Sequence, residues 1–286
     1  MIRQRLIVLF VLCLAASVAA QDRKEKSVTF RTSDGVTLHL LEAGAGRAIV
    51  FIPGWTMTAD IFEPQISTLS SKYHVIAIDP RSHGDSGKPS EGNDLARHAA
   101  DIKEVIDGLK LTNVVLAGWS NGVADVLSYV ARYGTANVGG IVLIDGFVKV
   151  NGPDMMTSMN ALLQSFQSDR AKFTDRFVRS MYKSKVSDQY IDHVKQQSMK
   201  APMNTAVVEM FNVISKADFT PILGRIDKPA LYVCEPFLES QSKLVQQNLP
   251  DARIEIMKDA GHALFVDEAE KFNELIASFI DSLHQQ

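Results

Sequence analysis

The sequence predicts an α/β fold: a mostly parallel eight-stranded sheet with helices on both faces and an inserted helical segment. Two observations carry this prediction. Short apolar runs rich in β-branched residues alternate with longer segments of helical periodicity, and this rhythm is typical of a parallel sheet with crossover helices. The rhythm stops at residues 149–225, where helical segments follow one another without a convincing strand.

The individual elements follow from the same patterns. The expected strands are residues 28–31, 36–41, 48–52, 75–78, 114–117, 141–144, 230–234 and 254–257. The expected helices are residues 60–70, 94–109, 122–133, 240–248 and 267–283. Only Ser33-Asp34-Gly35 separates the first two strands, and a turn that tight makes an antiparallel hairpin.

The first 20 residues predict a secretory signal peptide. Arg3 and Arg5 supply the positive end, residues 6–16 the apolar stretch and residues 18–20 a small-residue cleavage site. The apolar stretch is too short for a helix that must cross ~30 Å of hydrocarbon. We therefore expect export to the periplasm or the medium, with no stable membrane anchor.

Residues 149–225 are predicted to form a helical lid, inserted into a core made of residues 21–148 and 226–286. This helical insertion holds seven of the ten methionines of the chain: Met155, Met156, Met159, Met181, Met199, Met203 and Met210. Flexible thioether side chains suit an adaptable apolar pocket, and they suit the packing of a small helical subdomain about as well.

Charge and cysteine content narrow the range of partners. The 30 basic and 33 acidic residues nearly balance, so no single-sign field would draw the protein to nucleic acid, and small-molecule partners fit better. The sequence does not specify an oligomeric state. Once Cys13 is removed with the signal peptide, Cys234 is the one cysteine left, which excludes an internal disulfide. Cys234 falls in an apolar strand and is predicted to be a buried small hydrophobe.

The strongest catalytic signal is the G-x-S-x-G motif at residues 118–122. An apolar strand runs into this motif and a helical pattern follows it. In a nucleophile elbow the serine occupies a strained strand-to-helix turn, and the flanking glycines let strand and helix approach closely. Ser120 is therefore the predicted nucleophile.

A serine hydroxyl needs a base to take its proton, and that base needs an acid to hold its tautomer. His262 is the predicted base, because it follows the last expected strand and sites of such sheets form at the carboxyl ends of strands. The other histidines outside the segment of residues 78–86 are expected to be bystanders on helix surfaces or strands. They are His39, His74, His98, His193 and His284.

An oxyanion hole requires two backbone N–H groups aimed at the charge that develops on the attacked carbonyl. Asn121, directly after the nucleophile, supplies one expected donor. The other should come from the loop after the strand at residues 48–52, and the N–H of Trp55, next to Gly54, is the predicted donor.

With these motifs the chain resembles the α/β-hydrolase superfamily over almost all of its mature length, within the lidded serine esterase, lipase and haloperoxidase-like branch. Residues 78–86 also resemble the D-x-R-G-x-G-x-S segment of that family. In the family this segment braces the loops beneath the site, which implies structural roles for Asp79, Arg81 and His83. The family commonly has His-Gly in the first oxyanion loop, where this chain has Pro53-Gly54, and backbone donation survives that change.

The acid is the open member of the site. Relatives commonly carry an aspartate in the loop after the seventh strand, but here that loop is short and offers only Glu235 and Glu239. Asp145, at the end of the preceding strand, is the preferred candidate, because some family members take their acid from this position. The two glutamates remain the alternatives.

Together these residues predict a hydrolase that cleaves carboxylic esters of small, mainly apolar substrates through an acyl-enzyme on Ser120. No metal or cofactor is expected, since the chain lacks H-E-x-x-H, histidine pairs at helical spacing and a phosphate-binding G-x-x-x-x-G-K loop. The alternatives are an aminopeptidase, for which Glu209, Asp188 and Asp192 are available to hold an amine, a C–C bond hydrolase, and a non-catalytic small-molecule binding protein.

Overall fold

The structure, a computed structural model, describes residues 25–150, 152–216 and 218–283. The predicted signal peptide at residues 1–20 and Cys13 lie outside the described residues, so export stays a prediction. Within the ranges that the structure covers, no helix has both the length and the apolar character needed to cross a lipid bilayer.

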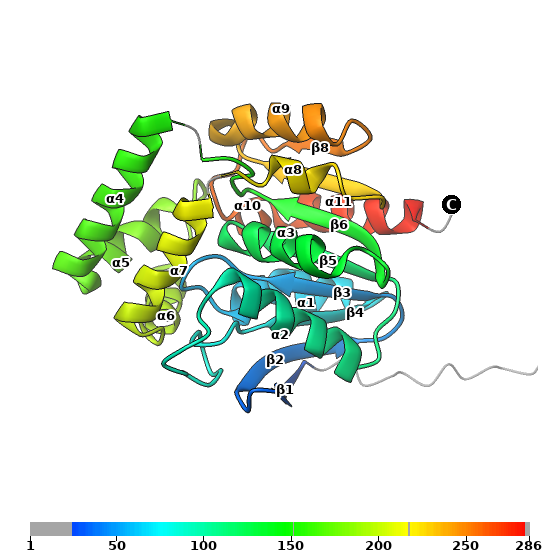
Figure 1. The fold of residues 1–286 in the computed structure, drawn as a ribbon, viewed down its shortest axis with the longest axis horizontal. Coiled ribbons are helices and arrows are strands. Elements are labelled where there is room, and N and C mark those ends of the chain that lie inside the picture. Colours follow the sequence, from blue (N-terminus) through cyan, green and yellow to red (C-terminus); the bar gives the residue numbers. More distant parts are fainter. Residues whose placement is uncertain (1–24, 151, 217, 284–286) are drawn as a thin grey trace, which may run out of the picture.

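The centre of the molecule is one eight-stranded sheet with the strand order β1-β2-β4-β3-β5-β6-β7-β8 (Figure 1). Strand β2 pairs antiparallel with β1 and with β4, and every other pairing in the sheet is parallel. The strands are β1 (Lys26–Arg31), β2 (Thr37–Gly44), β3 (Ala48–Ile52), β4 (His74–Ile78), β5 (Val114–Trp119), β6 (Val138–Ile144), β7 (Ala230–Cys234) and β8 (Arg253–Ile256). The predicted fold class, with its antiparallel opening hairpin, is confirmed.

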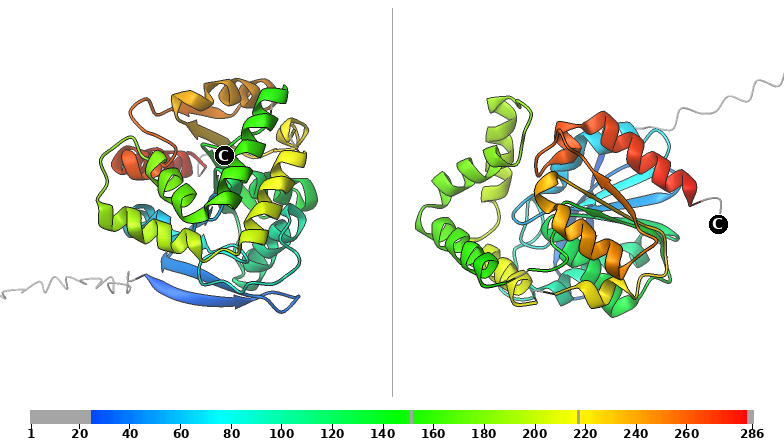
Figure 2. Two further views of the ribbon diagram at one scale, coloured as in Figure 1. Left: turned by 90° about the vertical axis from the view of Figure 1, so that its left-hand side faces the viewer. Right: turned by 90° about the horizontal axis from the view of Figure 1, so that it is seen from above.

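Helices cover both faces of the sheet, as the views in Figures 1 and 2 show. The core helices are η1 (Ala59–Phe62), α1 (Glu63–Leu69), α2 (Leu95–Gly108), α3 (Asn121–Tyr133), α9 (Glu239–Asn248), α10 (Leu264–Asp267) and α11 (Ala269–Ser282), with a short 3-10 turn η2 (Pro236–Leu238) before α9. The helix predicted at residues 267–283 corresponds to α11 but begins at Ala269, because the backbone leaves the helical region at Glu268 (φ −121°, ψ 52°) and separates α11 from the short α10.

Successive side chains of each central strand point alternately into two apolar layers, one on each face of the sheet. In β5, for example, Val114 and Leu116 pack with the buried faces of α2 and α3, whereas Val115, Ala117 and Trp119 pack with those of α1 and α11. A strand that is apolar on both faces reads as a continuous hydrophobic run, which is why the central strands were recognisable in the sequence.

The helical insertion, residues 149–225, leaves the sheet after β6 and returns before β7. Its described helices are α4 (Gly152–Ser168), α5 (Arg170–Ser180), α6 (Asp188–Met199), α7 (Met203–Lys216) and α8 (Thr220–Leu223). The two ends of the insertion meet, since Lys149 and Asp218 form an isolated antiparallel bridge. Helices α4–α7 gather beyond one end of the sheet (Figures 1 and 2).

Candidate active site

Ser120 occupies a sharp turn between β5 and α3. Its backbone is left-handed, with φ 55° and ψ −116°, and it caps the first turn of α3. Strand and helix approach so closely here that a Cβ on Gly118 would lie 2.2 Å from the carbonyl oxygen of Gly122. The strained serine and the bare glycine are what a nucleophile elbow requires.

The structure brings Ser120, His262 and Asp145 together in one chain of hydrogen bonds. The Nε2 atom of His262 lies 2.9 Å from Ser120 Oγ, and its Nδ1 atom lies 2.6 Å from Asp145 Oδ2. The Asp145 side chain is fully buried, whereas 24% of the His262 side chain is exposed. The buried Asp145 carboxylate thus holds the His262 ring at Nδ1, while part of the ring remains accessible to solvent.

Two residues that the sequence analysis did not assign hold His262 in place. The indole Nε1 of Trp119 donates to the His262 carbonyl at 2.9 Å, and the two rings lie 5.1 Å apart between centroids. Asp267 accepts a hydrogen bond of 2.8 Å from the N–H of Gly261. Trp119 is the variable residue before the serine of the motif, and Asp267 follows His262 by five residues. Their closeness in sequence to Ser120 and His262 was the one signal that could have identified them.

The two alternative acids lie differently from Asp145. The backbone N–H of Glu235 donates to Asp145 Oδ1 at 2.7 Å, so Glu235 supports Asp145 through the main chain. Glu239 is exposed and forms an ion pair of 3.0 Å with Lys243. Burial, and next the charge of Asp145, raise the pKa of the Glu235 carboxyl.

Glu235 adds a third potential metal ligand to this cluster. One carboxylate oxygen each of Asp145 and Glu235 and a ring nitrogen of His262 lie within 4.8 Å of one another. Both ring nitrogens of His262 are already engaged, however, by Asp145 and by Ser120. Because a metal must displace one of these partners, the arrangement favours a proton-transfer role for His262 over metal ligation.

Neither expected oxyanion donor has an acceptor for its main-chain N–H within the part of the chain that the structure describes. Asn121 is the first residue of α3, where a main-chain N–H has no intrahelical acceptor. In the loop after β3, the N–H groups of Thr56 and Met57 are taken by His83 and by Gly54, respectively. The N–H of Trp55, between them, has no acceptor among the described residues.

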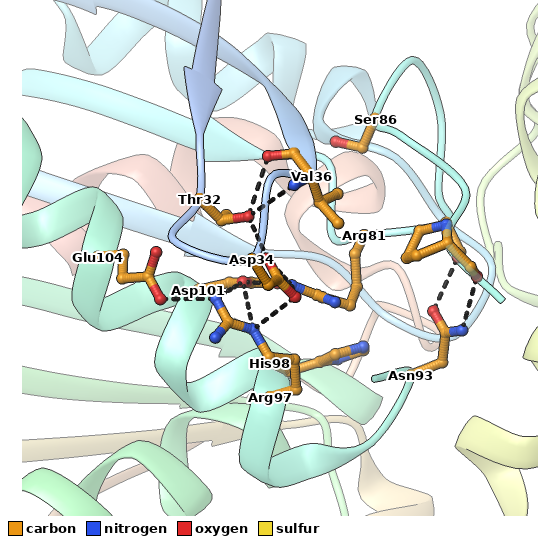
Figure 3. Close-up of polar contacts among 12 residues, drawn as sticks. Thr32, Asp34, Val36, Arg81, Ser86, Asn93, Arg97, His98, Asp101 and Glu104 are labelled. Carbon is orange, nitrogen blue, oxygen red and sulfur yellow. Dashed lines mark hydrogen bonds and ion pairs between the residues drawn. The ribbon is translucent and has the colours of Figure 1, made fainter. Parts of the chain in front are cut away.

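The family-like segment at residues 78–86 lies beneath these loops. Asp79 accepts hydrogen bonds from the N–H of Ala59 (2.7 Å) and of Asp85 (2.9 Å), which fastens two loops at once. The buried Arg81 guanidinium binds Asp101 of α2, with Nε and Nη2 at 2.6 and 2.8 Å from its two oxygens. Figure 3 shows how this pair continues to Asp34, in the turn between β1 and β2. These contacts brace the site from below.

Of the remaining histidines, His98 differs from the sequence-based expectation of a bystander on the helix surface. It is buried on the inner face of α2, and its Nδ1 lies 3.1 Å from Asp125 Oδ1 of α3. The reason is that residue 98 shares the buried side of the helix with Leu95, Ala99 and Ile102. The expectation suits His193, which is exposed on α6; His284 lies outside the described residues.

Apolar side chains of the insertion surround the indole of Trp55. The Phe166 ring of α4 lies 4.7 Å from it between centroids, and the Phe173 and Phe177 rings of α5 lie at 6.1 and 5.9 Å. Four methionines of the insertion pack against the same cluster while remaining partly exposed: Met156, Met159, Met203 and Met210. Adaptable apolar surface therefore adjoins the loop that carries the expected oxyanion donor.

The acidic residues considered for an amine site do not converge. Glu209 is buried in α7, only 2% exposed, and faces His83. Asp188 and Asp192 are exposed on α6 and pair with Arg179 and Lys195, respectively. The three carboxylates therefore form no common site for a substrate amine.

Comparisons with known proteins show the family and the fold of this chain. A family model described as "alpha/beta hydrolase fold" matches residues 47–194. The chain is 28% identical to the AB hydrolase superfamily protein YisY of Bacillus subtilis, over 88% of this chain and 98% of that one. It is 29% identical to a non-heme chloroperoxidase of Streptomyces lividans, over 89% and 99% of the two chains.

Among solved structures, an esterase from Exiguobacterium antarcticum superposes with a TM-score of 0.83 at 26% identity. The match covers 90% of this chain and all of the esterase. Since the family model spans more than half of the chain, this protein belongs to the α/β-hydrolase family.

Proposed function

We propose that this hydrolase cleaves carboxylic esters of small, mainly apolar substrates through an acyl-enzyme on Ser120. The observation that carries the proposal is the hydrogen-bond chain from Ser120 Oγ through the His262 ring to the buried Asp145 carboxylate. It has the geometry that a serine nucleophile, a general base and an orienting acid require.

In the proposed cycle, His262 carries its proton on Nδ1, toward Asp145, so that Nε2 is free to accept the proton of Ser120. The serine oxygen attacks the ester carbonyl, and the N–H groups of Trp55 and Asn121 stabilise the oxyanion. His262 then gives the proton to the departing alcohol. Water, activated by the same ring, hydrolyses the acyl-enzyme and restores Ser120. Each oxyanion donor is expected to lower the barrier by roughly 3 kcal/mol.

The surroundings of Trp55 support an apolar substrate. The partly exposed apolar side chains that pack around this residue include Met156 and Met210. An acyl or alcohol group that reaches from Ser120 toward the insertion would meet these apolar side chains. We therefore expect butyryl and hexanoyl esters to have lower KM values than acetyl esters.

The test is active-site labelling. A fluorophosphonate should label Ser120 in the parent protein and should fail to label Ser120→Ala, which should also lose turnover of p-nitrophenyl butyrate. Ser128→Ala, on the buried side of the same helix α3, is the matched control and should retain both. Labelling of Ser120→Ala at another residue would refute the mechanism, and a parent that binds esters without releasing product would favour the binding-protein alternative.

A second candidate uses the same acyl-enzyme with hydrogen peroxide in the place of water, which yields a peracid. The name of the Streptomyces lividans relative, a non-heme chloroperoxidase, favours this candidate. Peracid released from an ester in the presence of hydrogen peroxide is measured by iodide oxidation.

Assays with prolyl amides and with substrates cleaved at a C–C bond test the proposed ester specificity. Faster turnover of either than of the esters would contradict it.

A further inference from the structure

Thr56, in the loop after β3, has a backbone conformation that needs an explanation. Its φ is 59°, in the left-handed region, and the residue is almost completely buried. For a β-branched residue this conformation is unfavourable, so it persists only where the surrounding structure imposes it. Thr56 directly follows Trp55, the expected oxyanion donor.

The surroundings that impose this conformation belong largely to the helical insertion. The hydroxyl of Thr56 lies 2.8 Å from that of Ser198, at the end of α6. The neighbouring indole of Trp55 donates to the carbonyl of Ala206 in α7 at 2.7 Å. Two consecutive residues of the loop are thus tied to two helices of the insertion.

A third contact reaches the main chain of Thr56. Its N–H donates to Nε2 of His83 at 3.1 Å, and Nδ1 of the same ring lies 3.0 Å from the carbonyl of Arg81. In this arrangement Nε2 is the acceptor of the Thr56 N–H, and Nδ1 is the donor to the Arg81 carbonyl. Oε2 of Glu209 in α7 lies 3.3 Å from the same Nε2 atom.

Glu209 packs against that ring at a buried position. Its side chain is 2% exposed, and neither carboxylate oxygen has a hydrogen-bond partner among the described residues. Its other oxygen, Oε1, lies 3.8 Å from Nε2 of His98 in α2. A buried carboxyl without hydrogen-bond partners is costly, and it is tolerated only where histidine side chains lie beside it. Glu209 therefore favours one docked position of α7 over all others.

We propose that the helical insertion completes the oxyanion hole by holding Thr56 in its left-handed conformation, with Glu209 and Ser198 as positioning residues. The inference rests on the proposed ester hydrolysis. If these contacts are lost, Thr56 relaxes to a negative φ and the peptide between Trp55 and Thr56 rotates. This movement shifts Trp55 and, with it, the adjoining Gly54–Trp55 peptide that carries the donor N–H. Misplacing a catalytic group by about 1 Å costs about 100-fold in rate, so the transition state suffers more than substrate binding.

The test compares Glu209→Leu and Ser198→Ala with Asn212→Ala. Asn212 is the matched control, because it also ties α7 to the core but donates to the carbonyl of Asn93, outside the oxyanion loop, at 3.3 Å. On p-nitrophenyl butyrate, Glu209→Leu should lower kcat by about 10-fold or more and Ser198→Ala by about 5-fold, with KM changed less than about 3-fold. Asn212→Ala should keep kcat within about 2-fold.

A trifluoromethyl ketone probes the oxyanion hole directly, since Ser120 adds to it and leaves a charged oxygen where the substrate oxyanion forms. Its affinity should fall by the same factor as kcat/KM in the two positioning variants. A second arm repeats Glu209→Leu in a Thr56→Gly background. Glycine adopts the left-handed conformation without help, so the loss of kcat caused by Glu209→Leu should be smaller there.

Three results would overturn the inference: kcat within about 2-fold of the parent in both variants, a loss confined to KM, or an equal loss in the Thr56→Gly background. If Glu209→Leu does not fold, Ser198→Ala decides alone, because it removes one oxygen atom. Failure of the proposed function is distinguishable, since then the parent itself would neither bind the ketone nor accept the fluorophosphonate label.

Discussion

Asp145 fixes the ring of His262 from below, with Oδ2 2.6 Å from Nδ1, while its other oxygen accepts the N–H of Glu235 at 2.7 Å. The backbone of Asp145 is left-handed, with φ 44°, and its N–H donates to the carbonyl of Val233 in β7 at 2.8 Å. Aspartate tolerates this conformation better than most residues. The carboxylate is thus aimed at one ring nitrogen by two neighbouring strands.

The Asp145→Asn variant should therefore lose about 10⁴-fold in kcat, because an amide no longer holds the tautomer in which Nε2 accepts the proton of Ser120. Glu239→Gln, at an exposed residue paired with Lys243, is the control and should keep parental kcat. Steady-state hydrolysis of p-nitrophenyl butyrate, measured on variants with parental circular dichroism spectra, gives the comparison.

Glu235 makes this prediction sharper. Its carboxylate lies within 4.8 Å of the contacting atoms of Asp145 and His262, near enough to take over part of the role when Asp145 is neutralised. Adding Glu235→Gln to Asp145→Asn should then remove residual activity, whereas Glu235→Gln alone should have a small effect. Full activity of Asp145→Asn together with a large loss in Glu235→Gln would transfer the role of the acid to Glu235.

Much of the fold could be predicted because the central strands are continuously apolar. The strands at residues 48–52 and 230–234 were predicted with the observed bounds. Strand β6 was predicted to start at Ile141 but begins at Val138, since Gly139 and Gly140 carry no strand signal of their own. Their pairing is decided by the neighbouring strand β5, which a local pattern does not reveal.

The site divides in the same way. Ser120 and His262 could be named from the sequence because each follows a recognisable strand, whereas Asp145 was preferred over Glu235 and Glu239 partly on the family resemblance. Glu209 and Thr56 could not be given their positions, because what they contact lies far away in the chain. A buried position at residue 209 was detectable in principle from its helical spacing to Ala206 and Val213, but the identity of its partner, His83, depends on how the insertion docks.

Gly54 is expected to tolerate no side chain. A Cβ at this residue would lie 2.9 Å from the Cβ of Ser120 and 3.3 Å from the indole of Trp119. Either the loop or the serine must move, so Gly54→Ala should lower kcat by about 10- to 100-fold. Gly224→Ala is the control, because the nearest atom to its added Cβ is the carbonyl oxygen of Asn248 at 3.9 Å. A parental kcat in Gly54→Ala would contradict this prediction, because the loop would then accommodate the added methyl group without disturbing the site.

Cys234 should be chemically inert in the folded protein. The residue is fully buried in β7, and burial, followed by the nearby charge of Asp145, raises the pKa of its thiol to about 12. Thiolate is the reactive form, so a disulfide reagent such as Ellman's reagent should not react at pH 8 with protein expressed without residues 1–20. In guanidinium chloride one thiol should react at once. Rapid reaction under native conditions would contradict the burial of β7.

His98 should make the stability of the protein depend on pH on the alkaline side. Burial by itself would lower its pKa, but the carboxylates of Asp125, Glu209 and Asp101 raise the pKa of His98 to about 9. An unfolded histidine titrates near ~6.5, so the folded protein binds this proton more tightly than the unfolded chain does. The stabilisation is fully present below pH ~6.5 and is lost as the pH rises through about 9.

Urea unfolding from pH 6.5 to 9.5 should therefore show the free energy of unfolding falling by up to about 3 kcal/mol. His98→Asn should be less stable at neutral pH and should lose most of this slope, since no proton is then released at residue 98. His193→Asn removes an exposed imidazole of α6 and should keep the parental slope. If the parent is equally stable across this pH range, His98 is neutral in the folded protein and does not supply a positive charge beside Glu209.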